Sequence, residues 1–264
     1  MDTAYLNAFY EGYDEEQRFA RRSSRVEFLT TLRYIDRYLR PGMRILEVGA
    51  GTGRYSRHYA AQGYSVDAVE LVEHNIAVLQ EHRTPEMDLC VRQGNACDLS
   101  AYADNRFDRT LLLGPLYHLF SPEDKRRAVA EALRVTKPGG LLYAAFIMND
   151  ATILSWGLRQ GHLAEGLKNG LITKDFHCAS VPEMVFEMST LEEIESLMAE
   201  FPLKTRHLVA SNGMSCHFAD CLDGADDALF DAWLAYHFHT CERRELLGYS
   251  SHLLFVGEKD GKTV

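Results

Sequence analysis

Between residues 44 and 147, short apolar runs alternate with segments of helical periodicity, and this alternation constrains the fold more than any other feature. The runs are continuous rather than alternating apolar and polar, which is typical of strands covered on both faces. We therefore predict an α/β fold with a doubly wound, mostly parallel sheet and right-handed crossovers. The predicted strands are 44–48, 64–69, 88–93, 107–113 and 141–147.

Helix-start signals mark three of the predicted helices. Ser24 and Glu27 have the spacing of a capping box, as do Thr190 and Glu193. Ser121 precedes a proline and an acidic residue, which predicts an N-cap followed by a first helical turn. The first of these helices is expected to continue to Leu39, where Pro-Gly stops it, and Lys-Pro-Gly-Gly at 137–140 predicts a turn before the fifth strand.

Beyond the fifth predicted strand the pattern is less regular. Residues 149–181 have about the length of a helix pair and are only weakly patterned. Residues 203–209 and 251–256 are expected to be strands, and 225–247 are expected to be mostly helical. We treat 1–264 as one domain with an N-terminal helical cap (1–40), a core (41–147), an insertion (148–200) and C-terminal strands with a helix (201–264).

The most informative local motif is the glycine-rich turn after the first predicted strand. Gly49, Gly51 and Gly53 allow positive φ and close approach of a ligand to the backbone. A dinucleotide site requires G-x-G-x-x-G, but Arg54 occupies the position of the third glycine. Glu47, two residues before the turn, opposes a pyrophosphate and suits a cationic ligand. S-adenosylmethionine carries an ammonium and a sulfonium and no phosphate.

Glu70 ends the second predicted strand, and a carboxylate at that place can accept both ribose hydroxyls of an adenosine. This residue alone does not separate NAD from S-adenosylmethionine, and the alternative is a simple polar strand end. With Arg54 and Glu47 taken into account, an NAD-dependent oxidoreductase is disfavoured.

Five segments in order resemble the class I S-adenosylmethionine-dependent methyltransferases, in particular a bacterial small-molecule subgroup of the type 11 kind. They are 47–53, Glu70, 94–96, 111–119 and 133–140. The resemblance covers about residues 40–147. Asn95 is a departure, because the family often has Asp there, although an amide still bonds the adenine edge. The resemblance implies a Rossmann-like seven-stranded sheet with an antiparallel last strand and helical lid insertions.

The resemblance also implies S-adenosyl-L-methionine as cofactor and a set of residues that hold it. Tyr13 is the expected covering residue from the N-terminal aromatic segment, and the alternative for it is one packed aromatic among several. The full set of expected cofactor contacts is Tyr13, Glu47, Gly49, Ala50, Gly51, Gly53, Glu70, Leu71, Asn95, Ala96 and Leu113.

Methyl transfer needs little covalent help, because positioning supplies most of the acceleration. His118, after the fourth predicted strand, is the candidate proton acceptor, with Tyr117 a lesser one. The alternative is that His118 caps or packs locally. Acceptor recognition is expected from 149–181, which carries aromatic residues and histidines, although that segment also suits a helical lid or a dimer surface.

The formal net charge of −10 disfavours nucleic acid and anionic membranes as partners. Neither a signal peptide nor a long apolar segment is evident, and the six cysteines are scattered, so we expect reduced thiols in a cytoplasmic protein. Cysteines and histidines between 216 and 241 leave a zinc site as a minor alternative; we expect no metal.

We expect a small-molecule methyltransferase. A protein or RNA methyltransferase and a non-catalytic cofactor-binding protein on the same fold remain open alternatives. The oligomeric state also remains open, with a homodimer as one candidate.

Overall fold

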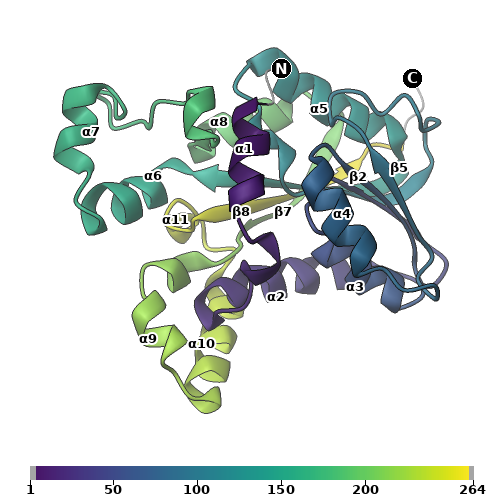
Figure 1. The fold of residues 1–264 in the computed structure, drawn as a ribbon, viewed down its shortest axis with the longest axis horizontal. Coiled ribbons are helices and arrows are strands. Elements are labelled where there is room, and N and C mark those ends of the chain that lie inside the picture. The colour runs from purple at the N-terminus through teal and green to yellow at the C-terminus, as the bar shows by residue number, and fades with distance from the viewer. Residues whose placement is uncertain (1–3, 262–264) are drawn as a thin grey trace.

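The fold is built on one sheet whose strand order is β3-β2-β1-β4-β5-β8-β7 (Figure 1). It is described by a computed structural model of residues 4–261. The strands are β1 Arg44–Val48, β2 Ser65–Glu70, β3 Leu89–Gln93, β4 Phe107–Leu112, β5 Thr136–Met148, β6 Met188–Ser189, β7 Leu203–Ala210 and β8 His252–Lys259. All pairings are parallel except those of β8, which is antiparallel to both β5 and β7.

The predicted doubly wound sheet is confirmed, with one addition. The two-residue strand β6 pairs with the end of β5, so the sheet has eight strands rather than seven. The helices are α1 Ala4–Gly12, α2 Arg22–Asp36, α3 Arg54–Ala61, α4 Glu73–Glu81, α5 Pro122–Val135, α6 Asn149–Thr152, α7 Leu163–Asn169, α8 Leu191–Ala199, α9 Ala219–Asp223, α10 Asp227–Thr240 and α11 Arg244–Leu247. Short helical turns are η1 Glu15–Gln17, η2 Pro115–His118, η3 Ile153–Arg159, η4 Pro182–Met184 and η5 Gly213–Cys216.

Two of the three predicted helix starts are confirmed. Ser121 caps α5 by accepting from the Asp124 amide, and Thr190 forms the capping box of α8 with Glu193. The predicted capping box of α2 is wrong, because the N-cap is Arg21, three residues before Ser24. The Glu27 carboxylate instead accepts a hydrogen bond from the Arg18 guanidinium at 2.6 Å.

Two boundaries also differ from the sequence prediction. Helix α2 ends at Asp36 rather than Leu39. The predicted turn at 137–140 is the beginning of β5, which pairs with β4 through a register shift between Phe107 and Arg109. Residues 137–140 have no partner in the ladders of β4 and β8, so the Pro-Gly-Gly segment bulges out of the sheet between Thr136 and Leu141.

The central strands form the core because both of their faces are covered. Four of the five residues of β1 are buried, as are five of the six of β4. Away from the sheet, α6 and α7 form an arm at the upper left of Figure 1, and α9 and α10 lie at the lower left. Among the helices of residues 4–261, none is long and apolar enough to cross a membrane.

Candidate active site

A cavity of about 870 Å³, counted to its open mouth, lies at the carboxyl ends of β1, β2 and β4. Strand order reverses at this point, because β1 lies between β2 and β4, and open α/β sheets bind ligands at such a place. The lining comes from the turns after the strands and from the N-terminal segment. It comprises Leu6, Tyr10, Glu15, Arg18, Phe19, Glu47, Gly49, Ala50, Gly51, Thr52, Arg54, Tyr55, Glu70, Leu71, Asn75, Gly94, Asn95, Ala96, Leu113, Gly114, Pro115, Tyr117, His118 and Leu119.

The glycine turn is fastened across the end of β2. The amides of Gly49 and Ala50 both donate to the Val69 carbonyl, at 2.8 and 3.0 Å. Gly49 has φ of +72°, and a Cβ there would lie 2.6 Å from Cδ of Pro115, so only glycine fits. Gly51 has φ of +56°, and a Cβ there would meet only the Glu15 side chain, at 3.6 Å. The space beside Gly51 therefore belongs to the cavity.

Gly53 is absent from the cavity lining, although it was expected to contact the cofactor. It is the N-cap of α3 with φ of +80°, and a Cβ there would lie 2.6 Å from Cγ of Leu79. Its surroundings indicate that this glycine is needed where α3 packs against α4.

Glu70 is buried at the end of β2, on the cavity wall. Its two carboxylate oxygens accept the amides of Gly51, at 2.7 Å, and Val72, at 2.9 Å. Burial raises the pKa of this carboxyl above its ordinary value, although the backbone donors oppose the rise. Asn75 also lines the cavity, and its buried Oδ1 has no hydrogen-bond partner among the described residues. A ligand with hydroxyl or amine donors would satisfy that oxygen.

Glu47 is buried beneath the glycine turn. Its Oε2 accepts both the amide and the hydroxyl of Ser56 on α3. Burial raises the pKa of Glu47 to about 8, against the lowering effect of Ser56. This carboxyl therefore serves the packing of α3 as well as lining the cavity.

The remaining expected cofactor contacts in the turns after β2, β3 and β4 also line the cavity. They are Leu71, Asn95, Ala96 and Leu113. The Oδ1 of Asn95 accepts the Cys97 amide at 2.9 Å, so its side chain also shapes its own turn.

Helix α1 covers the cavity with residues other than the one expected. Leu6 and Tyr10, four positions apart on one helix face, line it, whereas Tyr13 is 39% exposed and stacks on Phe9 outside the lining. The i, i+4 spacing of Leu6 and Tyr10 is a signal that sequence inspection could have used. None of the aromatic residues or histidines of 149–181 lines this cavity; Trp156 stacks on His162 instead.

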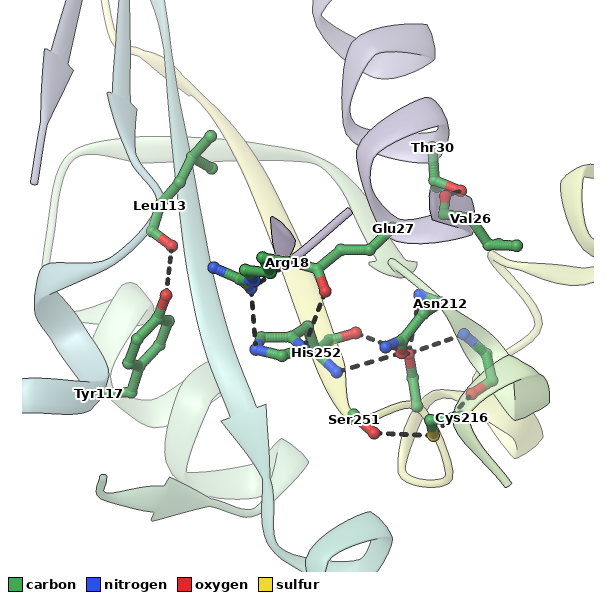
Figure 2. A network of polar contacts seen from close by, with 12 residues as sticks. Arg18, Val26, Glu27, Thr30, Leu113, Tyr117, Asn212, Cys216, Ser251 and His252 are labelled. Carbon is green, nitrogen blue, oxygen red and sulfur yellow. Dashed lines mark hydrogen bonds and ion pairs between the residues drawn. The ribbon is translucent and has the colours of Figure 1, made fainter. Parts of the chain in front are cut away.

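Arg18 is a cavity-lining cation that the sequence analysis missed. Figure 2 shows it between Glu27 and His252. Its guanidinium donates to Glu27 at 2.6 Å, to Glu15 at 3.3 Å and to Nε2 of His252 at 3.4 Å. Burial lowers the pKa of Arg18, but the carboxylates more than offset this and keep it charged. The Glu15-x-x-Arg18 spacing was the available signal, but no local pattern points to His252.

Both ring nitrogens of His118 are occupied. Nδ1 lies 2.8 Å from the Val185 carbonyl, which can only accept, so Nδ1 carries the proton. Nε2 lies 3.0 Å from the Tyr10 hydroxyl. Burial lowers the pKa of His118 to about 4, so the neutral ring accepts from Tyr10 at neutral pH. The neighbouring Tyr117 hydroxyl donates to the Leu113 carbonyl at 3.0 Å (Figure 2).

The described residues also address the alternative of a zinc site. They contain no group of three or more His, Cys, Asp or Glu side chains placed to hold a metal ion. The thiol of Cys216 instead accepts from the Ser251 hydroxyl at 2.7 Å (Figure 2).

The similarity of this sequence to known proteins is limited to part of the chain, and the family match lies within the core. Residues 46–144 match the family model described as a methyltransferase domain. A demethylmenaquinone methyltransferase from Renibacterium salmoninarum is 39% identical over 107 residues, 40% of this chain and 41% of that protein. A glycine/sarcosine N-methyltransferase from Aphanothece halophytica is 30% identical over 142 residues, 52% of each. The chain thus spans about two fifths to one half of the length of these curated relatives.

The architecture is shared more widely than the sequence. The crystal structure of an S-adenosylmethionine-dependent methyltransferase from Methanosarcina mazei has a TM-score of 0.58 to this chain at 18% identity. The match covers 87% of this chain and 98% of that one. In residues 46–144 this chain therefore carries a domain of the methyltransferase family, on the fold of the class I S-adenosylmethionine-dependent methyltransferases.

Proposed function

We propose that this protein transfers the methyl group of S-adenosylmethionine to a small-molecule acceptor. The observation that carries the proposal concerns Gly51 and Glu70, which line the same cavity. The Gly51 amide of the open turn donates to the buried Glu70 carboxylate at 2.7 Å. A nucleoside lying on this turn would place its ribose hydroxyls at Glu70. The orphaned Oδ1 of Asn75 fits a ligand that brings hydrogen-bond donors.

The charges of the cavity suit a cationic nucleoside with an amino-acid tail. The lining carboxylates of Glu15 and Glu70 favour positive charge over a pyrophosphate, whereas Glu47, with its pKa raised to about 8, is mostly uncharged at neutral pH. We assign Arg18 to the carboxylate of that tail, because its side chain is less exposed than that of Arg54, the other arginine of the lining. The bound cofactor supplies an electrophilic methyl on a sulfonium. The protein's part is to hold the acceptor in line with it and to exclude water under α1.

Three features favour a small acceptor. The net charge is −10, which is unsuited to RNA. Helix α1 closes over the cavity through Leu6 and Tyr10. The two curated relatives are named after demethylmenaquinone and glycine/sarcosine, both small molecules. We propose that residues 41–147, together with Arg18, bind the cofactor and that segments outside this core, α1 among them, bind the acceptor.

His118 stays a candidate proton acceptor under this proposal. With Nδ1 bonded to Val185 and Nε2 to Tyr10, a role as base requires the Tyr10 bond to break first. The geometry gives His118 a second role, which is to hold α1 in place over the cavity.

Calorimetric titration with S-adenosylhomocysteine tests the proposal. We expect a dissociation constant in the micromolar range or tighter for the unmodified protein, and no binding of NADH. If NADH binds and S-adenosylhomocysteine does not, the proposal is wrong.

Methyl-labelled S-adenosylmethionine with a cell extract separates the acceptor classes. Label in the low-mass fraction supports the proposal, whereas label in protein or RNA points to a macromolecular acceptor. Binding without transfer to either fraction points to a non-catalytic protein.

A further inference from the structure

The acceptor end of the cavity offers a ligand the lone pairs of the Tyr10 hydroxyl but no carboxyl that is free to take up a proton. On the basis of the proposed function, we infer that the methyl acceptor is an amine nitrogen carrying N–H, attached to a compact apolar body. The inference depends on three observations: the direction of the Tyr10–His118 bond, the occupation of each carboxyl around the cavity, and a second cavity beside the first.

The Tyr10 hydroxyl presents oxygen lone pairs to the cavity. Because Nδ1 of His118 is fixed as a donor by the Val185 carbonyl, its Nε2 must accept from Tyr10. The single proton of the Tyr10 hydroxyl is therefore committed to His118. What remains at this oxygen can only accept, so it favours a ligand group that donates. Both an O–H and an N–H satisfy this requirement, so the choice between them depends on how the nucleophile loses its proton.

No carboxyl of the cavity lining is free to remove a proton from a hydroxyl. Glu15 is paired with Arg18, and Glu70 accepts two backbone amides. Glu47 is bonded to Ser56 beneath the turn. A hydroxyl nucleophile must lose its proton before or during attack, which calls for a base in hydrogen-bond reach. An unprotonated amine needs none at that stage.

The chemical step balances without a protein base. The nitrogen lone pair forms the new N–C bond as the carbon–sulfur bond breaks, and the electron pair of the broken bond stays on sulfur as a neutral thioether. The nitrogen then carries the positive charge and an extra proton, which leaves to water. The amine must arrive unprotonated, so the proton of its ammonium form is also given up to water.

A second cavity provides room for the body of the acceptor. It adjoins the first through two shared lining residues, Leu6 and His118, and its volume is about 620 Å³ to its open mouth. Its walls are α1, the start of α5 and the η4 turn. Its described lining is Tyr5, Leu6, His118, Phe120, Ser121, Asp124, Pro182 and Val185.

The composition of this second cavity matches an amine rather than an acid. Most of its lining is aromatic or aliphatic, and Asp124 is its one charged residue. A carboxylate that forms no ion pair among the described residues repels a carboxylate-bearing acceptor. The apolar walls favour a body with little polarity of its own.

A matched series of acceptors tests the inference with the full chain at pH 8. Benzylamine, benzyl alcohol and benzyl mercaptan share one skeleton and differ in the nucleophile; an arylamine and two further arylalkylamines extend the amine set. With S-adenosylmethionine present, we expect turnover of at least one amine and at least tenfold slower methylation of the alcohol and the thiol. Preferred methylation of either, or no methylation of any amine, overturns the inference.

Variants locate the effect at Tyr10. Tyr10→Phe removes the lone pairs but keeps the ring, so kcat for the amine should fall roughly five- to tenfold. The affinity for S-adenosylhomocysteine should stay within about twofold, which also shows that the variant is folded. Tyr249→Phe is the control, because Tyr249 is 46% exposed and lines neither cavity. Equal kcat in Tyr10→Phe and the unmodified protein contradicts the inference.

The calorimetric control separates this inference from the proposed function. If S-adenosylhomocysteine binds and the amines are not methylated, only the inference fails. If S-adenosylhomocysteine does not bind, the proposed function fails with it.

Discussion

Three glycines with left-handed backbone offer a direct test of which part of the turn receives the cofactor. Gly51, Gly53 and Gly63 have φ of +56°, +80° and +85°, so an alanine at each pays a similar conformational cost. They differ in what the new methyl group would meet. At Gly63 nothing lies within 4 Å, at Gly53 Cγ of Leu79 lies at 2.6 Å, and at Gly51 the methyl group enters the cavity.

The expected magnitudes follow from these surroundings. Gly63→Ala should lower the free energy of unfolding by about 1 kcal/mol, the cost of left-handed backbone for alanine. Gly53→Ala should lower the free energy of unfolding by about 2–4 kcal/mol, because overpacking against buried Leu79 adds to the cost of left-handed backbone. Gly51→Ala should lose about 1 kcal/mol of stability, but it should weaken S-adenosylhomocysteine binding at least about tenfold, or 1.4 kcal/mol.

Urea unfolding and calorimetric titration measure the two quantities separately. Binding per folded molecule should be unchanged in Gly53→Ala and Gly63→Ala. In a Leu79→Ala background, the stability costs of the Gly53 and Gly63 substitutions should become similar, because the obstructing side chain is gone. Equal costs without the Leu79 change would refute the packing role of Gly53. Binding lost equally at Gly51 and Gly53 would show instead that both contact the cofactor.

Further predictions concern the buried titratable groups. The pKa of Glu47 is about 8 in the folded protein against an ordinary 4.5, so its stabilising contribution is complete below about pH 4.5 and is lost as pH rises through 8. The stability of the unmodified protein relative to Glu47→Gln should therefore fall from pH 5 to pH 8 by up to about 1.4 kcal/mol per pH unit in urea unfolding; a flat difference contradicts the raised pKa. Glu70→Gln should weaken S-adenosylhomocysteine binding roughly 10- to 100-fold in calorimetry, because a charged acceptor of the ribose hydroxyls is lost, and an unchanged affinity would remove Glu70 from the site. The pKa of His118 is about 4, so the methylation rate should show no His118 inflection between pH 6 and 8; an inflection near 6.5 that disappears in His118→Asn would identify it as the base.

The core of the fold, residues 41–147, could be predicted because its constraints lie within a few residues of one another. Continuous apolar runs indicate buried parallel strands, and glycines at 49 and 51 indicate backbone that other residues cannot adopt. The place of Glu70 on the cavity wall could be predicted because it ends a buried strand. These features depend on local backbone geometry, which the sequence reports directly.

The rest of the site depends on contacts between distant segments. The choice of Tyr10 rather than Tyr13 as the residue over the cavity depends on how α1 docks, which no local pattern states. In the same way, the packing role of Gly53 depends on Leu79 of α4, whose side chain leaves no room for a Cβ at position 53. The sequence offers both tyrosines and all three glycines as equivalent candidates, and packing distinguishes them.

The sequence by itself determined the alternating α/β order, the glycine turn and the acidic strand end, because each follows from propensities and backbone limits of neighbouring residues. Only the tertiary structure decided that Arg18 meets His252, 234 positions away, and that Val185 fixes the proton on His118. Side-chain partners and the protonation that they impose come from long-range packing, which is why the chemistry of the acceptor end emerged only in three dimensions.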